Sequence, residues 1–596
     1  MPIYNAPTRD QKFVMHEMLN AVQLSEYERF ADVDTDLIDA VLEESAKFST
    51  EVLTPLNVVG DHEGCVRHPD GSVTTPTGFK DAFKTMAENG WTALGHDPEY
   101  GGQGLPGILS IAAGEMQSAA NMAFAMYPGL TNGAIKAISI GGSAEQKAAY
   151  LPKMVSCEWT GTMNLTEPHC GTDLGLLKTK AVPNSDGSYK ISGQKIFISA
   201  GEHDMSDNII HLVLARIEGA PEGVKGISLF IVPKFKLDAD GNAGERNAVS
   251  CGSIEEKMGI HGNSTCVMNY DEAEGYMIGE ENKGLRVMFV MMNRARVDVG
   301  MQGLAQSEVA YQNAAAYAKD RLQGRSLTGP KNEDGPADPI IVHPDVRRML
   351  METKAFNEGA RALIYWATLL EDLENVHPDE KFREKCDDYL GLLTPVIKGY
   401  LTDKAMQTTI DCQQIFGGHG YIEEWGMSQF VRDTRIALIY EGANGIQALD
   451  LVGRKLARKG GRALMTLNAE IDAFLAENGD NDKLPDFMTG LKTAKGKLTE
   501  ATMWLMQNGM TNPNNAGAGS VDYMHMMGLS TLAYMWAMMG VTAQKAIDNG
   551  SNEDFYANKI ITGRYFMLRM LPMMDAHLAK IKTGAEPVMA LDAAAF

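Results

Sequence analysis

A single carboxylate follows an apolar run in the stretch RIALIYEGANGIQALD, which covers residues 435–450. The run ends at Tyr440, Glu441 comes next, and Gly442 and Gly445 mark a turn before a second apolar pattern begins. A Glu at the end of a segment is most often solvated. The alternative is a general base, which must lie on a rigid element with its pKa suited to the proton that it removes. The rest of the chain decides between the two.

Two further stretches could bind a polar ring. The loop TEPHCGTDLG, residues 166–175, combines hydroxyls with Gly and Pro, and such loops can present backbone N–H groups to an anion or a heterocycle edge. The segment GQKIFISAG, residues 193–201, is a predicted strand in which Phe197 and Ser199 share one face. That pair could pack on a ring and hydrogen-bond to its edge. The simpler alternatives are a plain turn and a core phenylalanine.

Two helix ends carry polar groups of a different kind. The segment DRLQGR, residues 320–325, brings Arg321 and Gln323 to the end of a predicted helix, where they could contact phosphate or adenine or be solvated. The segment QIFGGHGYIEE, residues 414–424, has three glycines around His419. Helix capping explains one glycine, so the other two indicate close approach of the backbone to another group.

Two tempting motifs are set aside. Residues 101–107, GGQGLPG, contain a literal GxGxxG, but the dinucleotide fingerprint requires a preceding strand, and here helical segments precede it and Pro106 interrupts it. His169 lies beside Cys170, yet catalytic Cys and His residues are usually distant in sequence. Neither a Rossmann site nor a cysteine nucleophile is expected.

Composition excludes several classes of partner. The 596 residues are 44% hydrophobic and 22% charged, as in an ordinary globular protein, and the net charge is −23. Nucleic acid and anionic membranes both require basic surface, so neither is expected as a partner. The seven cysteines are an odd number without CxxC spacing, which predicts reduced thiols, a cytoplasmic location and no metal site. The first residues lack the pattern of a signal peptide.

Residues 521–541 are long and apolar enough to require a membrane check. They contain Asp522 and His525 and are rich in methionine, which suits adaptable packing. We therefore expect a buried or partner-facing helix and no integral membrane segment.

The elements that must position these residues follow from the hydrophobic spacing. Leu37, Val41 and Phe48 recur at helical spacing, which is typical of the first 160 residues. Residues 161–280 break into short apolar runs separated by Gly, Asn, Asp and Pro, as strands do. No helix-length segment separates these runs, so we expect an antiparallel sheet.

The remainder of the chain returns to helical spacing. We therefore predict an α+β multidomain protein with four parts: an N-terminal helical domain (1–160), a β-barrel-like middle domain (161–280), a helical bundle that carries Glu441 (281–458) and an extra C-terminal helical domain (459–596).

The motifs are more specific as an ordered set than any one of them is alone. The chain contains TEPHCGTD, GQKIFIS, EEKMGIHGNSTC, NRARV, DRLQGR, QIFGGHGY and RDTRIALIYEGANGIQ in sequence. Each is weak alone, but the ordered set resembles the acyl-CoA dehydrogenase family over roughly residues 30–455. The layout of helices, β-domain and helical bundle is the architecture of that family, and the extra C-terminal region resembles its long members.

The resemblance implies bound FAD, a CoA thioester substrate and α,β-desaturation. Glu441 matches the position of the family's base, which removes a proton from Cα while hydride leaves Cβ for flavin N5. An electron-transferring flavoprotein is the implied electron acceptor, and a homodimer or a dimer of dimers is the implied assembly.

The resemblance also implies roles for individual residues. The implied FAD contacts are Met163, Leu165, Thr166, Thr172, Phe197, Ser199, Arg321, Gln323, Gln414, Gly417, Gly418 and Asn444. The implied substrate contacts are Thr172, Asn293, Arg296, Tyr440 and Gly442.

The chain departs from the family's pattern at several of these positions. Phe197 and Ser199 stand where Trp and Thr are common, and Ala443 stands where many members have Thr, so a flavin hydrogen bond from that hydroxyl is missing unless Asn444 replaces it. The RLQGR form also lacks a common Phe.

The opening segment PTRDQKFVMHEMLN, the RLQGR form and the EGANGIQ form look most like the long members that oxidise 3-(methylthio)propanoyl-CoA in dimethylsulfoniopropionate demethylation. Three alternatives stay open: a dehydrogenase for ordinary fatty acyl-CoA substrates, an acyl-CoA oxidase that reduces oxygen, and a helical scaffold without catalysis.

Overall fold

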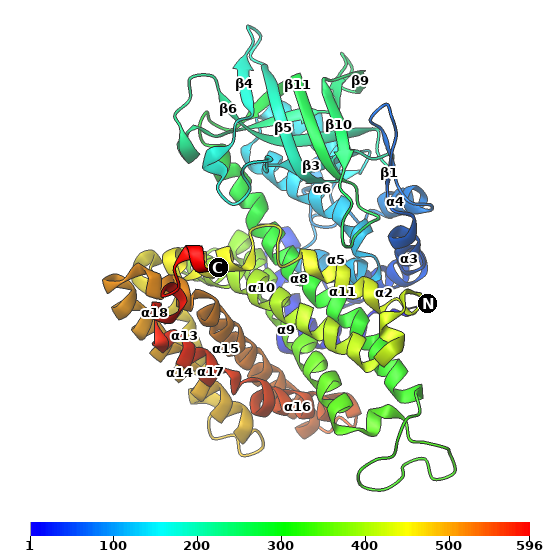
Figure 1. Ribbon diagram of the computed structural model, residues 1–596, viewed down its shortest axis with the longest axis vertical. Helices are drawn as coiled ribbons and strands as arrows, with labels where there is room; N and C mark the ends of the chain where they lie inside the picture. The colour runs from blue at the N-terminus through cyan, green and yellow to red at the C-terminus, as the bar shows by residue number, and fades with distance from the viewer. Residues whose placement is uncertain (1) are drawn as a thin grey trace. The chain divides into compact units, whose positions relative to one another are not determined.

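The computed structural model describes residues 2–596, apart from the side chain of Val290, and contains two compact units (Figure 1). The β-unit comprises residues 41–298, and the helical unit comprises residues 2–40 and 299–596. Helix α8 (Gly284–Asp320) continues through the boundary at residue 298. The sequence predicts residues 1–40 to be part of an N-terminal helical domain, whereas in the structure residues 2–40 pack within the helical unit.

The β-unit is built around a seven-stranded sheet that closes on itself. The strand order is β10-β11-β5-β4-β6-β3, and β7 pairs with both β6 and β11, so five strands form a ring. The strands are β3 (Trp159–Asn164), β4 (Lys180–Pro183), β5 (Tyr189–Ser199), β6 (Asn208–Ile217), β7 (Ser228–Pro233), β10 (Val249–Ile254) and β11 (Thr265–Ile278). Two short pairs complete the strands: β1 (Val66–Arg67) with β2 (Val73–Thr74), and β8 (Phe235–Leu237) with β9 (Ala243–Arg246).

The expectation of a purely antiparallel sheet is wrong in one respect. Strand β6 pairs in parallel with β3 and with β4, while the other pairs of the seven-stranded sheet are antiparallel. Parallel neighbours require a crossover of a dozen or more residues. The loop of residues 165–179 after β3 is long enough to bring the chain back to the same end of the sheet without an α-helix.

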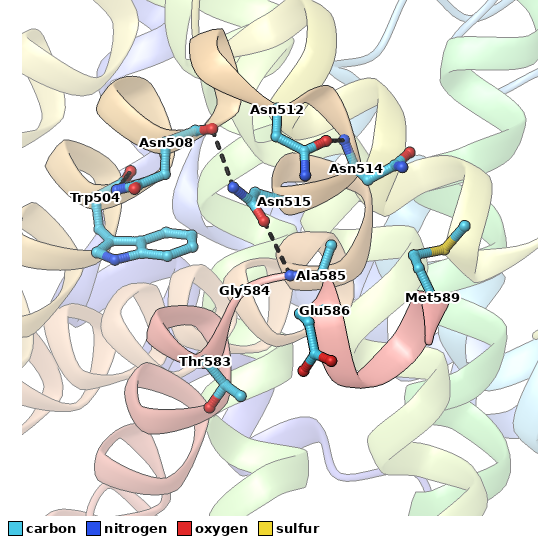
Figure 2. Close-up of a pocket in the computed structure, with 10 residues that line it drawn as sticks. All are labelled: Trp504, Asn508, Asn512, Asn514, Asn515, Thr583, Gly584, Ala585, Glu586 and Met589. Atoms are coloured by element: carbon cyan, nitrogen blue, oxygen red, sulfur yellow. Dashed lines mark hydrogen bonds between the residues drawn. The ribbon is translucent and has the colours of Figure 1, made fainter. Parts of the chain in front are cut away.

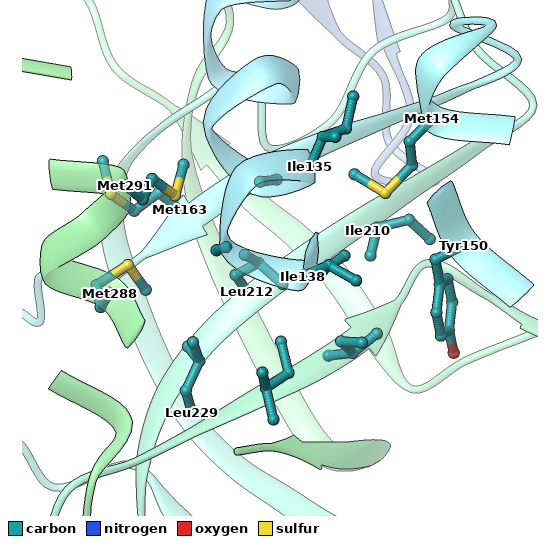
Figure 3. Packing of buried hydrophobic residues seen from close by; sticks show 14 of the residues in the cluster. Ile135, Ile138, Tyr150, Met154, Met163, Ile210, Leu212, Leu229, Met288 and Met291 are labelled. Carbon is teal, nitrogen blue, oxygen red and sulfur yellow. The ribbon is translucent and has the colours of Figure 1, made fainter. Parts of the chain in front are cut away.

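Helix α6 (Met122–Gly141) packs against β3, and apolar side chains fill the space between them (Figure 3). Ile135 and Ile138 from the helix meet Ile210 and Leu212 from β6 in this core. A Cβ atom at Gly161 would lie 2.5 Å from the Cβ of Ala134, so the close approach of β3 to α6 requires glycine. The other helices of the β-unit are α3 (Thr54–Glu63), α4 (Phe79–Glu88), α5 (Gly107–Ala120) and α7 (Ala144–Val155), while α2 (Thr35–Phe48) spans the boundary at residue 40.

Long helices dominate the helical unit. Helix α15 (Pro513–Asp548) has a buried face that includes Tyr523, Met527 and Trp536, which confirms the expected buried helix over residues 521–541. In the described chain, no helix has the length and apolar character that crossing a membrane requires. The helices are α1 (Thr8–Lys12), α9 (Pro344–Val376), α10 (Glu380–Ile415), α11 (Met427–Ile436), α12 (Asn444–Asp450), α13 (Arg462–Asn478), α14 (Pro485–Thr511), α15 (Pro513–Asp548), α16 (Asp554–Tyr565), α17 (Met573–Thr583) and α18 (Glu586–Met589).

A cluster of buried charged residues holds the N-terminal segment against helices α9 and α16 of this unit. Asp10 in α1 accepts hydrogen bonds from Arg361 of α9 and Lys559 of α16. Lys559 also donates to Glu358 at 2.6 Å, and Arg361 lies 3.3 Å from Glu308 of α8. Because each of these charges has an opposite partner, the cluster holds residues 2–40 in the helical unit.

Replacing Asp10 by Asn tests this cluster. Burial alone would raise the pKa of Asp10, but the charges of Lys559 and Arg361 hold it well below its usual value. The carboxylate therefore stabilises the fold above its ordinary pKa, and this contribution is lost as pH falls through the lower, folded-state pKa. We expect Asp10→Asn to lower the free energy of unfolding by about 3 kcal/mol at pH 7, with the difference from the unchanged protein shrinking below pH 4.

Urea unfolding of the full chain at several pH values measures this difference. Asp32→Asn, at an exposed position, is the matched control and should leave the free energy of unfolding unchanged. Equal stability of Asp10→Asn and the unchanged protein at pH 7 would contradict the stabilising role of the cluster.

Candidate functional site

Glu441 lies in a short turn between α11 and α12, and its backbone is left-handed. Its φ is +55°, and Gly442 follows with a φ of +87°. A non-glycine residue in this region costs on the order of 1–3 kcal/mol and persists only where its surroundings impose it. The turn therefore needs specific partners.

Gln447 supplies two of these partners. Its Nε2 donates to the backbone oxygen of Glu441 at 3.3 Å and to that of Gly442 at 3.1 Å. Gln447 is buried in α12, one helical turn after the start of that helix, and the backbone N–H of Asn444 donates to Leu438 O at 3.1 Å. The first turn of α12 thus holds, through hydrogen bonds, the backbone that carries the carboxylate.

Asn444, the first residue of α12, is buried and bonded to α10 through its side chain. Lys398 Nζ donates to its Oδ1 at 2.7 Å. Its Nδ2 shares two hydrogens among Asp403 Oδ1 at 2.7 Å, Thr402 Oγ1 at 2.9 Å and Gly399 O at 3.1 Å. The predicted contact of Asn444 with flavin would have to exchange one of these bonds, so in this structure the side chain anchors the turn.

The apolar run before Glu441 is only partly enclosed. Ala437 is buried, whereas Ile439 is 51% exposed and Glu441 and Gly442 are half-buried. The Tyr440 hydroxyl donates to Gln302 Oε1 of α8. The structure therefore brings three predicted residues, Tyr440, Glu441 and Gly442, together in one anchored turn.

In the β-unit, Phe197 is displayed to solvent by a β-bulge. Cys266 of β11 pairs with Ile198 and Met268 pairs with Lys195, so two residues of β5 oppose one of β11. Phe197 has a φ of +58° and is 60% exposed, while Ile198 beside it is buried. Bulges beside functional sites commonly re-aim a side chain. Phe197 is thus not a core residue, and the half-buried Ser199 lies two residues on.

A buried ion pair beneath this strand was not singled out by the sequence. Lys195 Nζ donates to Glu167 Oε1 at 2.8 Å and to Leu165 O at 2.9 Å, and both charged side chains are buried. Burial would raise the pKa of Glu167, but the Lys195 ammonium and further hydrogen bonds hold it below its usual value. The pair ties the loop after β3 to β5. Both residues lie within motifs quoted above, Lys195 in GQKIFIS and Glu167 in TEPHCGTD, and these motifs were the signal from which the pair could have been found.

The ion pair places several predicted residues along one loop. Ile196 N donates to Thr166 O at 2.9 Å, so the Leu165–Thr166 backbone runs beside β5. Met163 is buried in β3, Leu165 and Thr166 are half-buried, and Thr172 is exposed farther along the loop. Glu167, His169 and Cys170 also converge there, but the Glu167 oxygens already accept from Lys195, Lys178 and Thr179.

Asn293 and Arg296 lie one helical turn apart in α8. Arg296 Nη1 is 3.4 Å from Asn293 Oδ1, as residues three apart on one helix face allow. Both are in the β-unit, with Asn293 exposed and Arg296 half-buried.

Arg321 and Gln323 begin a loop whose start and end are joined by backbone hydrogen bonds. Ile340 N donates to Arg321 O at 2.8 Å and Gln323 N donates to Asp338 O at 2.9 Å. The Asp338 carboxylate accepts backbone N–H bonds from Ser326, Lys331 and Asn332, and these bonds lower its pKa to about 2. The loop is therefore ordered around Asp338, while the side chains of Arg321 and Gln323 stay exposed.

Gln414, Gly417 and Gly418 lie at the exposed end of α10. A Cβ at Gly417 or Gly418 would meet no atom of this chain within 4 Å, so both leave open backbone. The turn is braced by stacked rings: Tyr317 on Phe416 with centroids 4.1 Å apart, and His419 on Trp425 at 4.6 Å. Sequence spacing gave no signal for Trp425.

Each unit, taken by itself, presents groups whose chemistry suits part of an FAD molecule. The β-unit offers the exposed Phe197 ring and the Thr166 and Ser199 hydroxyls, which fit a flat ring with a polar edge. The helical unit offers the Arg321 guanidinium, the amides of Gln323 and Gln414 and the open glycine backbone, which fit phosphate and adenosine.

The extra C-terminal region contains an open pocket of about 440 Å³ (Figure 2). Asn515 Nδ2 donates to Asn508 O at 3.1 Å, and Asn515 Oδ1 accepts from Ala585 N at 2.9 Å. Glu586 is the only ionisable residue in the lining, and none of the predicted site residues contributes to it. The pocket thus lacks the groups that the predicted chemistry requires.

Comparison with protein families gives four matches in chain order. The acyl-CoA dehydrogenase N-terminal domain matches residues 41–158, the middle domain 162–273 and the C-terminal domain 282–456. A model described as acetyl-CoA dehydrogenase C-terminal like matches residues 467–592.

Several curated proteins are similar over essentially the whole chain. A 3-methylmercaptopropionyl-CoA dehydrogenase of Ruegeria pomeroyi is 42% identical, with 98% of this chain and 99% of that protein covered. A broad-specificity linear acyl-CoA dehydrogenase, FadE5, of Mycobacterium tuberculosis is 35% identical, with 100% of both chains covered.

Solved structures share the fold. ACDH-11 of Caenorhabditis elegans, in complex with C11-CoA, has a TM-score of 0.81 at 19% identity, covering 99% of this chain and 95% of that one. An acyl-CoA dehydrogenase from Bacillus anthracis, complexed with FAD, has a TM-score of 0.75 at 22% identity, covering 94% and 90%.

Replacing Phe197 by Ala tests whether this ring serves binding or packing. Because the ring is exposed, we expect Phe197→Ala to change the free energy of unfolding of the apoprotein by less than about 1 kcal/mol. Phe230→Ala, at a fully buried position of β7, should cost about 3–5 kcal/mol.

Urea unfolding measures both variants, and absorbance of the purified proteins measures bound flavin. Phe197→Ala should retain less flavin than the unchanged protein. A large loss of apoprotein stability together with full flavin content would show that Phe197 is a packing residue.

Proposed function

We propose the chemistry of this protein from one premise, which is that the chain belongs to the acyl-CoA dehydrogenase family. It is an oxidoreductase that uses FAD and acts on the CH–CH bond of acyl-CoA thioesters. The proposal concerns which residues carry the reaction and which acyl group is oxidised.

Glu441 is the proposed base, and its anchored turn is the observation that supports this role. A carboxylate that abstracts a proton from carbon must be held in place, because small displacements reduce the rate strongly. The left-handed backbone at Glu441, gripped by Gln447 and Asn444, meets that need. In the proposed reaction the Glu441 carboxylate takes the Cα proton of the thioester, and the Cβ–H bond breaks as the C=C bond forms.

FAD, when bound, supplies the acceptor for the hydride that leaves Cβ. We propose that Met163, Leu165, Thr166, Thr172, Phe197 and Ser199 hold its ring. Arg321, Gln323, Gln414, Gly417 and Gly418 hold its adenosine side, with a second copy of the chain contributing in a homodimer. Asn293, Arg296, Thr172, Tyr440 and Gly442 are the proposed substrate contacts.

The proposed substrate is 3-(methylthio)propanoyl-CoA, with 3-(methylthio)acryloyl-CoA as product in dimethylsulfoniopropionate demethylation. Support comes from the relative of that activity, which is 42% identical over 98% of this chain. The second candidate is a straight-chain fatty acyl-CoA, which the similarity to the broad-specificity linear acyl-CoA dehydrogenase favours.

We further propose that electrons pass to an electron-transferring flavoprotein and that the enzyme works in the cytoplasm. The seven cysteines are free thiols in the described chain, as a reducing compartment favours.

Anaerobic bleaching of the flavin absorbance tests the role of Glu441. With excess acyl-CoA, we expect Glu441→Gln to slow bleaching at least about a hundredfold, because general-base catalysis typically contributes 10²–10⁴-fold. Glu423→Gln, at an exposed position nearby in the sequence, is the control and should bleach at the unchanged rate. Bleaching that survives Glu441→Gln would assign the proton abstraction to another group.

The same assay separates the two substrates. Pentanoyl-CoA is the matched competitor, because a methylene replaces the thioether sulfur and the chain length is equal. We expect the bleaching rate divided by the apparent dissociation constant to be higher for the thioether. A higher value for pentanoyl-CoA or a longer straight chain would favour the fatty acyl-CoA assignment.

A further inference from the structure

The extra C-terminal region makes a direct polar contact with the anchor of the Glu441 turn. His525 of α15 places its Nε2 2.9 Å from Asp403 Oδ2, and the other oxygen of that carboxylate accepts from Asn444 Nδ2 at 2.7 Å. Asn444 begins α12 immediately after the turn. A hydrogen-bonded path of three side chains therefore joins α15 to the residue that anchors the turn.

Close packing fixes the position of His525. Helix α15 packs against both α10 and α12. A Cβ at Gly528 would lie 2.2 Å from Tyr400 Cδ1, and one at Gly399 would lie 2.3 Å from Met524 Sδ, so α10 and α15 approach as closely as glycine permits. The His525 ring also meets the edge of Tyr400, with centroids 5.4 Å apart. The ring has little freedom to turn away from Asp403.

A second histidine lies beside His525 but takes no part in the path. His577 of α17 has its ring 5.3 Å from that of His525, and its Nδ1 is 2.7 Å from Asp522 Oδ1. Both partners of His577 belong to the extra C-terminal region. It therefore provides a control for loss of a half-buried imidazole near α15 that leaves Asp403 untouched.

We propose that His525 and Asp403 are positioning residues for Glu441, so that the extra C-terminal region takes part in catalysis by orienting the base. His525 fixes the Asp403 carboxylate, Asp403 with Lys398 fixes the Asn444 amide, and Asn444 fixes the first turn of α12 from which Gln447 holds the Glu441 backbone. This inference rests on the proposed role of Glu441 as base.

The test is anaerobic flavin bleaching with holoenzyme variants and saturating acyl-CoA. His525→Phe keeps a ring of similar size and removes the bond to Asp403. We expect it to lower the bleaching rate about 10- to 100-fold, because misplacement by about 1 Å can cost that much. The apparent substrate dissociation constant, flavin content and melting temperature should stay close to those of the unchanged enzyme. His525→Gln, which can still donate to Asp403, should recover most of the rate, and His577→Phe should keep the unchanged rate.

A double-mutant cycle with Asp403→Leu distinguishes action through the path from a general structural effect. In the Asp403→Leu background, His525→Phe should have little further effect on the rate. Asp403→Leu alone carries the same prediction as His525→Phe, should the latter not fold.

An unchanged rate in His525→Phe, or an equal loss in His577→Phe, would overturn the proposal. So would a loss of rate that only follows a loss of flavin. Failure of the base assignment is seen separately, because it would appear as bleaching that survives Glu441→Gln.

Discussion

A carboxylate on left-handed backbone is the constraint on which the rest of the site depends. Glycine would adopt the φ of +55° at residue 441 without strain, but glycine has no group that can remove a proton. Placing Glu there costs on the order of 1–3 kcal/mol, which neighbouring bonds must offset. Gln447 holds the backbone of the turn, and the side chain of Asn444 ties α12 to α10. Hydrogen bonds from α12, which is itself bonded to α10, thus hold one short turn in place.

In the β-unit, a residue on strained backbone is likewise accompanied by buried polar bonds on neighbouring segments. Phe197 also has a positive φ, within a bulge that turns its ring away from the core. The buried Lys195–Glu167 pair holds the adjacent loop, and breaking such a pair is costly because the remaining charge would stay buried. In both units, strained backbone at a proposed functional residue is accompanied by buried polar bonds on neighbouring segments. Strain of this kind is expected where geometry serves chemistry.

Hydrophobic spacing predicted the order of helical and strand regions, and the ordered motifs predicted the family. Glu441 and Phe197 were singled out because an acid before a glycine turn and an aromatic beside a hydroxyl are visible in a few residues. The parallel pairing of β3 with β6 was missed, because a crossover without an α-helix leaves no periodic signal. The contact of α1 with α9 and α16 was missed because Asp10, Arg361 and Lys559 are far apart in the chain.

The partners of Asn444 were hidden for the same reason. The sequence suggested a flavin contact for this residue because it lies beside a position where many relatives have Thr. Within the chain its hydrogen-bond partners, Lys398 and Asp403, lie in α10, with α11 between that helix and α12, and His525 beyond Asp403 lies in a helix of the extra region. Contacts between helices with no spacing relation to one another require the fold. For that reason the sequence showed no sign of the polar contact between the extra C-terminal region and the residue that anchors the Glu441 turn.

The most direct measurement of the central claim is exchange of the substrate Cα hydrogen with solvent deuterium, followed by mass spectrometry of the acyl-CoA. Gln447→Leu keeps the Glu441 carboxylate and removes the two side-chain bonds that hold its turn. We predict that the unchanged enzyme incorporates deuterium and that Gln447→Leu, with normal flavin content, does so at least about tenfold more slowly. Equal exchange rates would show that the held turn is not what positions the base.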